Sequence, residues 1–430
     1  MLPPVSTHAR EMLRLTLVPG VGPILARRLI AHFGAVDRML RASPADMQRV
    51  DGIGDKLAPR IVAGLRDSER LADRECELCE RAGVRLIAVA DPAYPPLLAE
   101  TRDAPCVLYI RGDPAALSRA YTVAIVGSRH CTPYGIEQAE RFASFLASSG
   151  LIVVSGGARG IDSAAHRAAI RAQSVGAGGG TVAVLGCGLA NCYPPENAQL
   201  FQDIAGSGGA VVSELPMETG PNADNFPARN RVISALSLGV IVIEAPRGSG
   251  ALITARCAID EHGREVMAVP GRVDSPASEG SNQLIRKGEA ALVTAPGDVL
   301  EQLEEPARHQ WRGTHADRFE ASDPTGISRA DKRDGLLFGA AASAETTAGQ
   351  DGPAPLPRAA PVPKPPAAKP AAALTPNQTA LVNALASPMS FDELVRATGL
   401  AAGAIQADLT LLELRRVIRR EGPKFARRTT

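Results

Sequence analysis

The sequence lacks a long hydrophobic run and a leader-like beginning. No apolar stretch approaches the ~18 residues from which a membrane-spanning helix is recognised. The first residues, MLPPVSTHAREMLRL, do not show the charged-then-apolar order of a secretory signal. We therefore expect a cytoplasmic protein with no membrane partner.

An excess of charge of either sign is also missing. The chain has 47 Lys and Arg residues against 46 Asp and Glu residues, a formal net charge of +1. If the partner is a polyanion, the basic side chains that bind it must be concentrated locally. With 430 residues and 45% hydrophobic content, the chain is long enough for a large core and for two or three domains.

The cysteines do not form a disulfide framework. They number seven, an odd count, and are scattered along the chain, which favours reduced thiols. Cys76 and Cys79 form a CxxC inside a charged, helical pattern. A structural zinc site needs two further ligands at suitable spacing, and the sequence has no second pair, so we predict no bound metal.

Two nucleotide-binding fingerprints are missing as well. Residues 123–130 read VAIVGSRH, a β-branched run that ends in Gly127, Ser128 and Arg129. The run resembles the first strand of a dinucleotide-binding domain, but the series G-x-G-x-x-G does not follow it. The phosphate loop G-x-x-x-x-G-K-[ST] is absent too. We therefore predict no cofactor, and Arg129 needs another explanation.

Residues 1–117 contain two similar pieces, LVPGVGPILARRLIAHFG and VDGIGDKLAPRIVAGL. Each has a Gly-hydrophobic-Gly turn before an amphipathic helical pattern and resembles a helix-hairpin-helix motif, as in SAM-like domains. Such turns leave backbone N–H groups free to hold a phosphate. A small helical bundle that uses the turns only for packing is an equal alternative, because Asp51 and Asp55 in the second turn repel phosphate.

Residues 118–303 alternate apolar runs with helical patterns. Several runs are hydrophobic on successive positions, as expected for strands covered on both faces. Strand-helix alternation predicts an α/β fold with a doubly wound, mostly parallel, Rossmann-like sheet. The expected strands lie at 122–128, 151–157, 181–188, 210–215, 240–246, 265–271 and 290–295.

The rest of the chain divides into a tether and a small domain. Residues 304–373 lack periodicity and end in the proline-rich GPAPLPRAAPVPKPPAAKP, which predicts a flexible linker. Residues 374–430 resemble a winged helix-turn-helix. The expected recognition helix AAGAIQADLTLLELRR has no cation before Arg415, which favours protein contact or weak nonspecific DNA binding.

The loops after the strands are where a doubly wound sheet places its ligand. Residues 119–301 carry 14 Lys and Arg against 17 Asp and Glu, but five of these cations lie in or beside the expected mouth. This asymmetry predicts a focused anion site. The predicted site residues are Gly127, Ser128, Arg129, Gly156, Gly157, Arg159, Asn225, Phe226, Arg229, Asn230, Arg231 and Ser249.

An extended nucleic acid strand would use all of these groups. Arginines would hold phosphates, glycines would let the backbone approach, and Phe226 would stack on a base. Two alternatives stay open. Phe226 could only pack its loop, and Arg231 could pair with an acid such as Glu214 or Glu244 to hold the end of the sheet.

Taken together, the motifs resemble the DNA-processing protein A (DprA, or Smf) family. The matching stretches span about 121–301 in one order: VAIVGSR, SGGARGIDSAAH, VAVLGCGL with YPPEN, NFPARNRVISALS, SGALITARCAI and GREVMAVPG. The resemblance implies a homodimer that binds and protects incoming single-stranded DNA without sequence preference. It also implies loading of the recombinase RecA in natural transformation, and binding rather than catalysis.

Departures from the family pattern concern single loops. APRGSGALITA places Gly248 where relatives have an arginine, with Arg247 one position early, and Asp224 precedes the Asn-Phe pair. A rival interpretation is an enzyme similar to the Lonely Guy phosphoribohydrolases, which use a P-G-G-x-G-T-x-x-E loop. The same loop here lacks the glutamate, and Asp162 and His166 fit a role in capping and orienting better than acid-base chemistry.

Overall fold

The structure is a computed structural model. It describes residues 5–118, 121–174, 179–312 and 375–427, except for 386, 388, 401–404, 406–407, 410–411, 413–416 and 422–423. Within these ranges, none of the helices combines the length and the apolarity that crossing a bilayer requires.

The N-terminal region is helical, as predicted. Its helices are α1 (Thr7–Thr16), α2 (Pro23–Phe33), α3 (Val36–Leu40), α4 (Pro44–Met47) and α5 (Leu57–Ala82). Gly20 and Gly52 make the two hairpin turns, each with a φ of 88° that a side chain would disfavour. Both turns lead into an amphipathic helix, α2 and α5, so the predicted repeat of turn and helix is confirmed.

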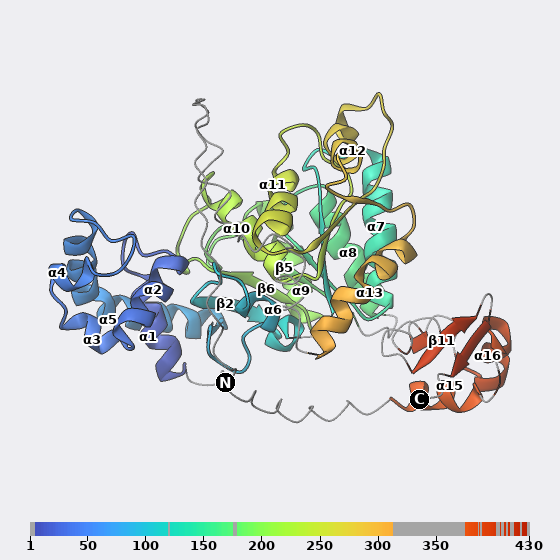
Figure 1. The fold of residues 1–430 in the computed structure, drawn as a ribbon, viewed down its shortest axis with the longest axis horizontal. Helices are drawn as coiled ribbons and strands as arrows, with labels where there is room; N and C mark the ends of the chain where they lie inside the picture. The colour runs from blue at the N-terminus through green and yellow to red at the C-terminus, as the bar shows by residue number, and fades with distance from the viewer. Residues whose placement is uncertain are drawn as a thin grey trace, which may run out of the picture.

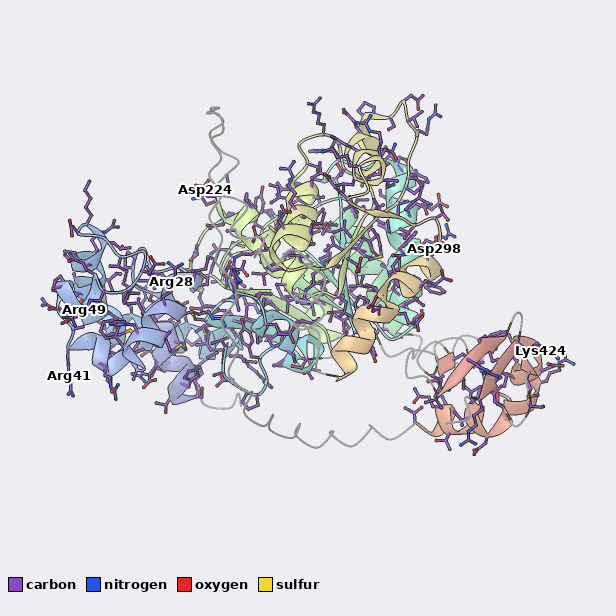
Figure 2. All side chains as sticks on the ribbon, in the orientation of Figure 1. Arg28, Arg41, Arg49, Asp224, Asp298 and Lys424 are labelled. Carbon is purple, nitrogen blue, oxygen red and sulfur yellow. The ribbon has the colours of Figure 1, made fainter. Side chains whose placement is uncertain are left out.

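The hairpin cations are engaged within the fold. The Arg28 guanidinium pairs with the Asp51 carboxylate at 2.9 Å and so joins α2 to the second turn. Arg27 donates to the carbonyl oxygen of Thr101. Arg41 and Arg49 lie on the side of these helices that faces away from the sheet (Figure 2). These contacts favour the alternative in which the turns serve packing.

The centre of the molecule is a nine-stranded sheet (Figure 1). In the spatial order of the strands, which begins β1-β2-β6 and ends β7-β8-β9, the first two pairs, β1–β2 and β2–β6, are antiparallel. All the following pairs are parallel. The strands, in spatial order, are β1 (Arg85–Ala88), β2 (Val107–Gly112), β6 (Ala210–Ser213), β5 (Gly180–Val184), β4 (Ile152–Ser155), β3 (Thr122–Val126), β7 (Gly239–Val242), β8 (Glu265–Ala268) and β9 (Ala291–Leu292).

The predicted fold class is confirmed, with one difference at the edge. All seven expected strands are present, and the order reverses between β3 and β7, as in a doubly wound sheet. β1 and β2 were not expected, and the boundary predicted at residue 117 falls between two strands of one sheet. Because β1 and β2 are joined to each other without a regular crossover helix, they do not show the strand-helix alternation that marks the other strands.

Side chains alternate between two apolar layers along each central strand. Val123 and Ile125 of β3 face α7 (Pro133–Ser148), α8 (Ile161–Ser174) and α13 (Pro296–Arg312). Ala124 and Val126 face the other layer, which contains α6 (Pro96–Ala99), α10 (Asn225–Ala235), α11 (Gly250–Arg256) and α12 (Glu279–Arg286). Burial on both faces explains why these strands are continuous apolar runs.

Shorter elements complete the central region. α9 (Ala198–Gly206) covers β5 and β6, and α13 includes residues 304–312, which the sequence had assigned to the linker. Single turns of 3-10 helix lie at Pro114–Leu117, Pro195–Asn197 and Pro276–Ser278, and a π-helical turn at Cys257–Glu261.

All seven cysteines are free thiols. Burial raises the pKa of the Cys79 thiol to about 12, which keeps it protonated.

The C-terminal region has its own small core. Its elements are α15 (Pro376–Ala384), β10 (Met389–Ser390), α16 (Phe391–Thr398), β11 (Ile418–Glu421) and β12 (Lys424–Arg427). The strands pair antiparallel in the order β10-β12-β11, the hairpin and short third strand of a winged helix. Most of the expected recognition helix, and residues 313–373 of the expected linker, lie outside the described residues.

Candidate nucleic-acid site

A cleft of about 700 Å³ opens where the strand order reverses, at the carboxyl ends of β3 and β7. Its lining includes seven of the predicted residues: Gly127, Ser128, Arg129, Phe226, Arg229, Asn230 and Ser249. A smaller pocket beside it adds Gly156 and Arg159, and shares Arg129, Phe226 and Arg229 with the cleft. Nine of the twelve predicted residues are therefore brought together.

The loop that carries Arg129 is fixed from two sides. The Ser128 N–H donates to the carbonyl oxygen of Glu244 at 2.7 Å, and the Ser128 hydroxyl accepts from the His130 N–H at 3.1 Å. The buried Glu244 carboxylate accepts from the N–H of Thr132 at 2.8 Å and from its hydroxyl at 2.6 Å. The backbone at Arg129 is thus held while its side chain stays exposed.

Arg129 lies against an aromatic pair. Its guanidinium carbon is 5.1 Å from the centroid of the Phe226 ring, within the range of a cation–π contact. The ring of Tyr193 is 5.4 Å from that of Phe226, centroid to centroid. Phe226 also packs on Gly186, where a Cβ atom would lie 2.8 Å from the Phe226 ring. Packing of Phe226 is thus observed, while stacking on a base stays a prediction.

Arg229 lies beneath the cleft rather than on its surface. Its guanidinium is buried and donates to the carbonyl oxygens of Gly156 and Val184. Burial, which opposes the charged form, lowers the pKa of Arg229 to about 10 despite the nearby carboxylate of Asp162. At neutral pH the group is still charged, so it supplies positive potential to the floor of the site.

Asp162 and His166 have structural environments. The Asp162 carboxylate accepts from the Ala158 N–H at 3.2 Å, and burial raises its pKa. Nδ1 of His166 is 2.6 Å from the hydroxyl oxygen of Thr181, inside the sheet layer. Burial lowers the pKa of His166 to about 3, so the ring is neutral. His166 does not line the cleft, and the contact of Asp162 with Ala158 fits the loop-orienting role that the sequence favoured for it.

Small residues and an amide close the far wall. The Asn230 amide donates to the carbonyl oxygen of Gly250 at 3.1 Å, and the Ser249 hydroxyl accepts from the Ala251 N–H at 3.3 Å.

Asn225 begins α10 and is half-buried outside the lining. Gly157 has a φ of 65° and packs on Phe201, also outside the lining.

Arg159 is at the rim and is engaged by an acid. Its Nε and Nη2 atoms are 2.6 and 2.5 Å from the same Glu196 oxygen. Both side chains are about half exposed, 50% for Arg159 and 54% for Glu196. The hydrogen bond and charge of Glu196 raise the pKa of Arg159, so the guanidinium stays charged.

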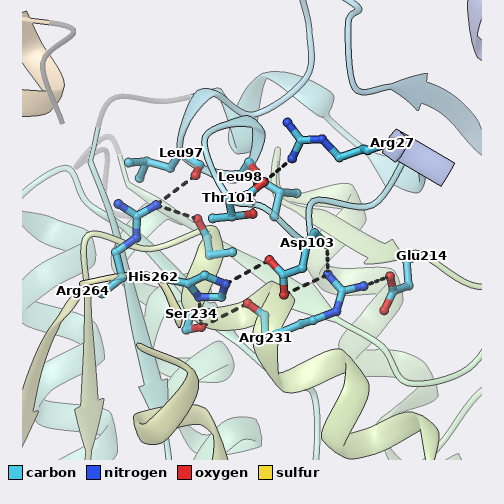
Figure 3. A network of polar contacts seen from close by, with 11 residues as sticks. Arg27, Leu97, Leu98, Thr101, Asp103, Glu214, Arg231, Ser234, His262 and Arg264 are labelled. Atoms are coloured by element: carbon cyan, nitrogen blue, oxygen red, sulfur yellow. Dashed lines mark hydrogen bonds and ion pairs between the residues drawn. The ribbon is translucent and has the colours of Figure 1, made fainter. Parts of the chain in front are cut away.

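Arg231 is not in the cleft, and the acid pairing considered for it is what the structure has. Its guanidinium pairs with Glu214 and lies 3.7 Å from Asp103, with only 14% of the side chain exposed (Figure 3). Side chains two positions apart on a helix point to different sides, and Arg231 points to a different side of α10 from Arg229. The position of Arg231 therefore does not support its predicted contact with DNA.

The network around Arg231 includes a serine, a histidine and an aspartate in series. Nδ1 of His262 is 2.7 Å from the Ser234 hydroxyl oxygen, and Nε2 is 3.2 Å from Asp103 (Figure 3). The order resembles a hydrolase triad, but Ser234 is 0% exposed and no substrate reaches it. One potential metal-ligand atom from each of Asp103, Glu261 and His262 lies within 4.8 Å of the other two. The positive charge of Arg231 beside Asp103 opposes the binding of a metal ion there.

The lining also contains residues that were not predicted, among them His130, Tyr193, Asn222 and Thr254. Tyr193 had a usable signal, since it follows the glycine turn after the third strand of the predicted sheet. Thr254 had none, because it lies one turn inside α11 and only the folded helix directs it to the cleft.

Three known families match the chain. The family described as DNA recombination-mediator protein A matches residues 85–304. The DprA winged helix domain matches residues 365–422, and the SAM-like helix-hairpin-helix tandem matches residues 12–67. The first match starts at the first strand of the sheet and so includes β1 and β2.

Individual proteins are similar over different lengths. Protein Smf of Escherichia coli is 45% identical over 232 residues, which are 54% of this chain and 60% of that protein. Protein Smf of Synechocystis sp. is 33% identical over 96% of both chains. The X-ray structure of DNA processing protein A from Streptococcus pneumoniae has a TM-score of 0.59 and 32% identity, and covers 70% of this chain and 98% of that one.

Proposed function

The chain belongs to the DNA recombination-mediator protein A family, which is the DprA family that its motifs resemble, and from this premise we propose that its cleft binds single-stranded DNA. Binding is independent of sequence, and the protein acts by holding the strand rather than by a chemical step. The observation that supports this most is the exposed Arg129, fixed over Phe226 where the strand order reverses.

The chemistry of the cleft suits a single strand better than a duplex. Cations for phosphates and aromatic faces for bases are the two elements of sequence-tolerant single-strand binding. Arg129 and Arg159 supply exposed charge, and Arg229 supplies charge from below. Tyr193 and Phe226 supply adjacent rings, which in a duplex would have no unstacked base to meet.

The wider role extends the proposal to partners. The protein binds and protects incoming single-stranded DNA, works as a homodimer through its Rossmann-like domain, and delivers the strand to the recombinase RecA during transformation and recombination. Family membership supports this role. The hairpin tandem and the winged helix assist it as accessory contacts, and the protein acts in the cytoplasm.

Salt-dependent binding of an oligo-dT strand tests the site. Arg129→Ala should weaken binding about tenfold, the value of ~1.4 kcal/mol for one charge-assisted contact. The slope of log K against log salt should become shallower by about 0.7, because one phosphate no longer releases its counterion.

Arg171→Ala is the matched control. Arg171 is likewise an exposed arginine, which pairs with Glu140 and lies at the far end of α8 from the cleft. Its removal should change neither affinity nor slope. Unchanged affinity and slope in the Arg129 variant would refute the site.

A nucleotide-hydrolysing enzyme similar to the Lonely Guy phosphoribohydrolases is the second candidate, because a cleft of about 700 Å³ admits a mononucleotide. Among the described residues, the one acid in the cleft lining is Asp162, whose carboxylate is buried against Ala158 and Arg229. Incubation with nucleoside monophosphates should therefore release no free base. Release of base that is lost in an Asp162→Asn variant would favour the enzyme instead.

A further inference from the structure

Glu196 occupies one of the cations that the proposed function assigns to DNA. A single carboxylate oxygen accepts from Nε and Nη2 of Arg159, at 2.6 and 2.5 Å. These are the donors with which an arginine binds a phosphate oxygen. The Arg159–Glu196 pair therefore has the geometry of a phosphate contact in which a carboxylate takes the place of the phosphate.

The three arginines of the smaller pocket differ in this respect. Arg229 is committed to the carbonyl oxygens of Gly156 and Val184. Arg129 lies over the Phe226 ring, with its charge neutralised by no acid among the ion pairs of the described residues. Of the three, Arg159 is the one for which the described residues form an ion pair with a carboxylate within 4.0 Å. Glu196 therefore acts on one defined position of the site.

The segment that carries Glu196 is anchored, so the carboxylate does not simply move away with the arginine. Glu196 lies in the Pro195–Asn197 turn. The buried amide of Asn197 donates to the carbonyl oxygen of Gly157 and to the Ser163 hydroxyl, both at 2.9 Å. Gly157 belongs to the loop that carries Arg159. The negative charge thus stays at the rim when the guanidinium turns toward a ligand.

We propose that Glu196 is a specificity-determining residue that competes with DNA phosphate for Arg159. This inference rests on the proposed function, since it needs a strand in the cleft. A weakly held anion, such as free phosphate or a mononucleotide, has to displace the carboxylate unaided. A strand already held at Arg129 presents its next phosphates at high effective concentration and displaces it readily. The pair therefore favours polymers over single nucleotides.

The strength of the pair suits such an exchange. Exposed ion pairs contribute little to stability, and both partners here are half exposed. A contact of this size lowers the affinity for DNA without blocking it. A fully buried pair would resist displacement, because a charge left without its partner in the interior is costly.

Glu196→Gln tests the proposal by oligo-dT binding at several salt concentrations. We expect binding about three- to fivefold tighter, because an exposed ion pair is a weak competitor. In the unsubstituted protein, the displaced carboxylate takes up a cation and offsets one released counterion. The variant lacks this uptake, so the salt slope should be steeper by up to about 0.7. Inhibition of oligo-dT binding by thymidine monophosphate should also become stronger.

Two comparisons isolate the effect. Glu140→Gln removes the same charge from another exposed pair, with Arg171, away from the cleft, and should change affinity by less than about 1.5-fold. In the Arg159→Ala background, Glu196→Gln should give no gain in affinity, because the arginine for which the carboxylate and the phosphate compete is absent. Glu196→Ala repeats the test without an amide that could still accept from Arg159.

The outcomes distinguish this inference from the proposed function. If the unsubstituted protein binds no oligo-dT, the proposed function fails and the inference fails with it. If Arg129→Ala weakens binding but Glu196→Gln and Glu196→Ala leave it unchanged, only the competitor role is refuted. Weaker binding by both Glu196 variants would show that the carboxylate positions Arg159 instead, and would also refute the proposal.

Discussion

Arginines that look alike in the sequence have four different environments in the fold. Arg129 is exposed over an aromatic ring, Arg159 is exposed beside a carboxylate, and Arg229 is buried among backbone carbonyls. Arg231 is largely buried between two acids. A guanidinium always carries its charge to the site, but its hydrogen bonds decide whether a ligand can use it. The ligand contacts that we propose are therefore those of Arg129 and Arg159.

Substitution at residue scale should separate stability from binding. Arg229→Leu removes the donors to two buried carbonyl oxygens and should lower the free energy of unfolding by about 2–4 kcal/mol. Arg129→Leu removes an exposed side chain and should stay within about 0.5 kcal/mol. The midpoints of urea unfolding, followed by circular dichroism, measure both. Equal midpoints would show that Arg229 is not a structural donor.

At the scale of elements, the site depends on two loops that pack against each other. The turn between β4 and α8 lies on the turn between β3 and α7, and the Ile161 N–H donates to the carbonyl oxygen of Ser128 at 3.2 Å. Gly160 makes this approach possible. It has a φ of 73°, and a Cβ atom there would be 2.4 Å from the Ser128 oxygen. The position of Arg129 therefore depends on a glycine in another loop.

Two glycine variants should show this dependence. Gly160→Ala combines an unfavourable φ with a backbone clash and should cost more than about 2 kcal/mol of folding free energy, with weaker oligo-dT binding. Gly248→Ala has a similar φ of 79° but open space around the position, so it should cost only ~1 kcal/mol. Thermal unfolding and oligo-dT titration of both variants provide the test. Similar losses in the two would mean that φ alone matters.

The part of the site that could be predicted from the sequence consists of residues that directly follow the parallel strands. Gly127 to Arg129, Gly156 and Ser249 could be placed together because the carboxyl ends of parallel strands share one edge. The sequence could not separate Arg229 from Arg231, since the direction of a side chain on α10 depends on how that helix packs. Glu196 was also beyond reach, because its pairing with Arg159 bridges 37 residues and follows no periodic pattern.

At the scale of the whole molecule, the N-terminal helices and the sheet share one core. Leu13, Leu29 and Ile61 of the helices belong to the same buried cluster as Val211 and Phe201 of the sheet region. The helices lie beside β2 at one end of the sheet (Figure 1). The buried Glu75 carboxylate of α5 accepts from the Met217 N–H and ties the two parts further. The C-terminal cluster contains only residues from 381 to 425.

Truncation should reveal this division. A chain that ends at Arg312 keeps the three clusters from Ala9 to Ala307 intact, so its main unfolding midpoint should shift by about 2 °C or less. A chain that begins after Ala82 loses half of a shared core and should unfold at a much lower temperature or aggregate. Calorimetry measures both. A stable N-terminal truncation would contradict the shared core.

The contacts of the rim side chains with one another have a kinetic consequence for the proposed DNA binding. Arg129 rests on Phe226, and Arg159 on Glu196, so each group that leaves a nucleotide returns at once to a neighbour within the protein. Dissociation can then proceed one nucleotide at a time, with no step in which several charges are stranded together. We expect a strand held in this way to have short local residence times under high overall occupancy. A second protein advancing along the DNA could then displace it progressively from one end.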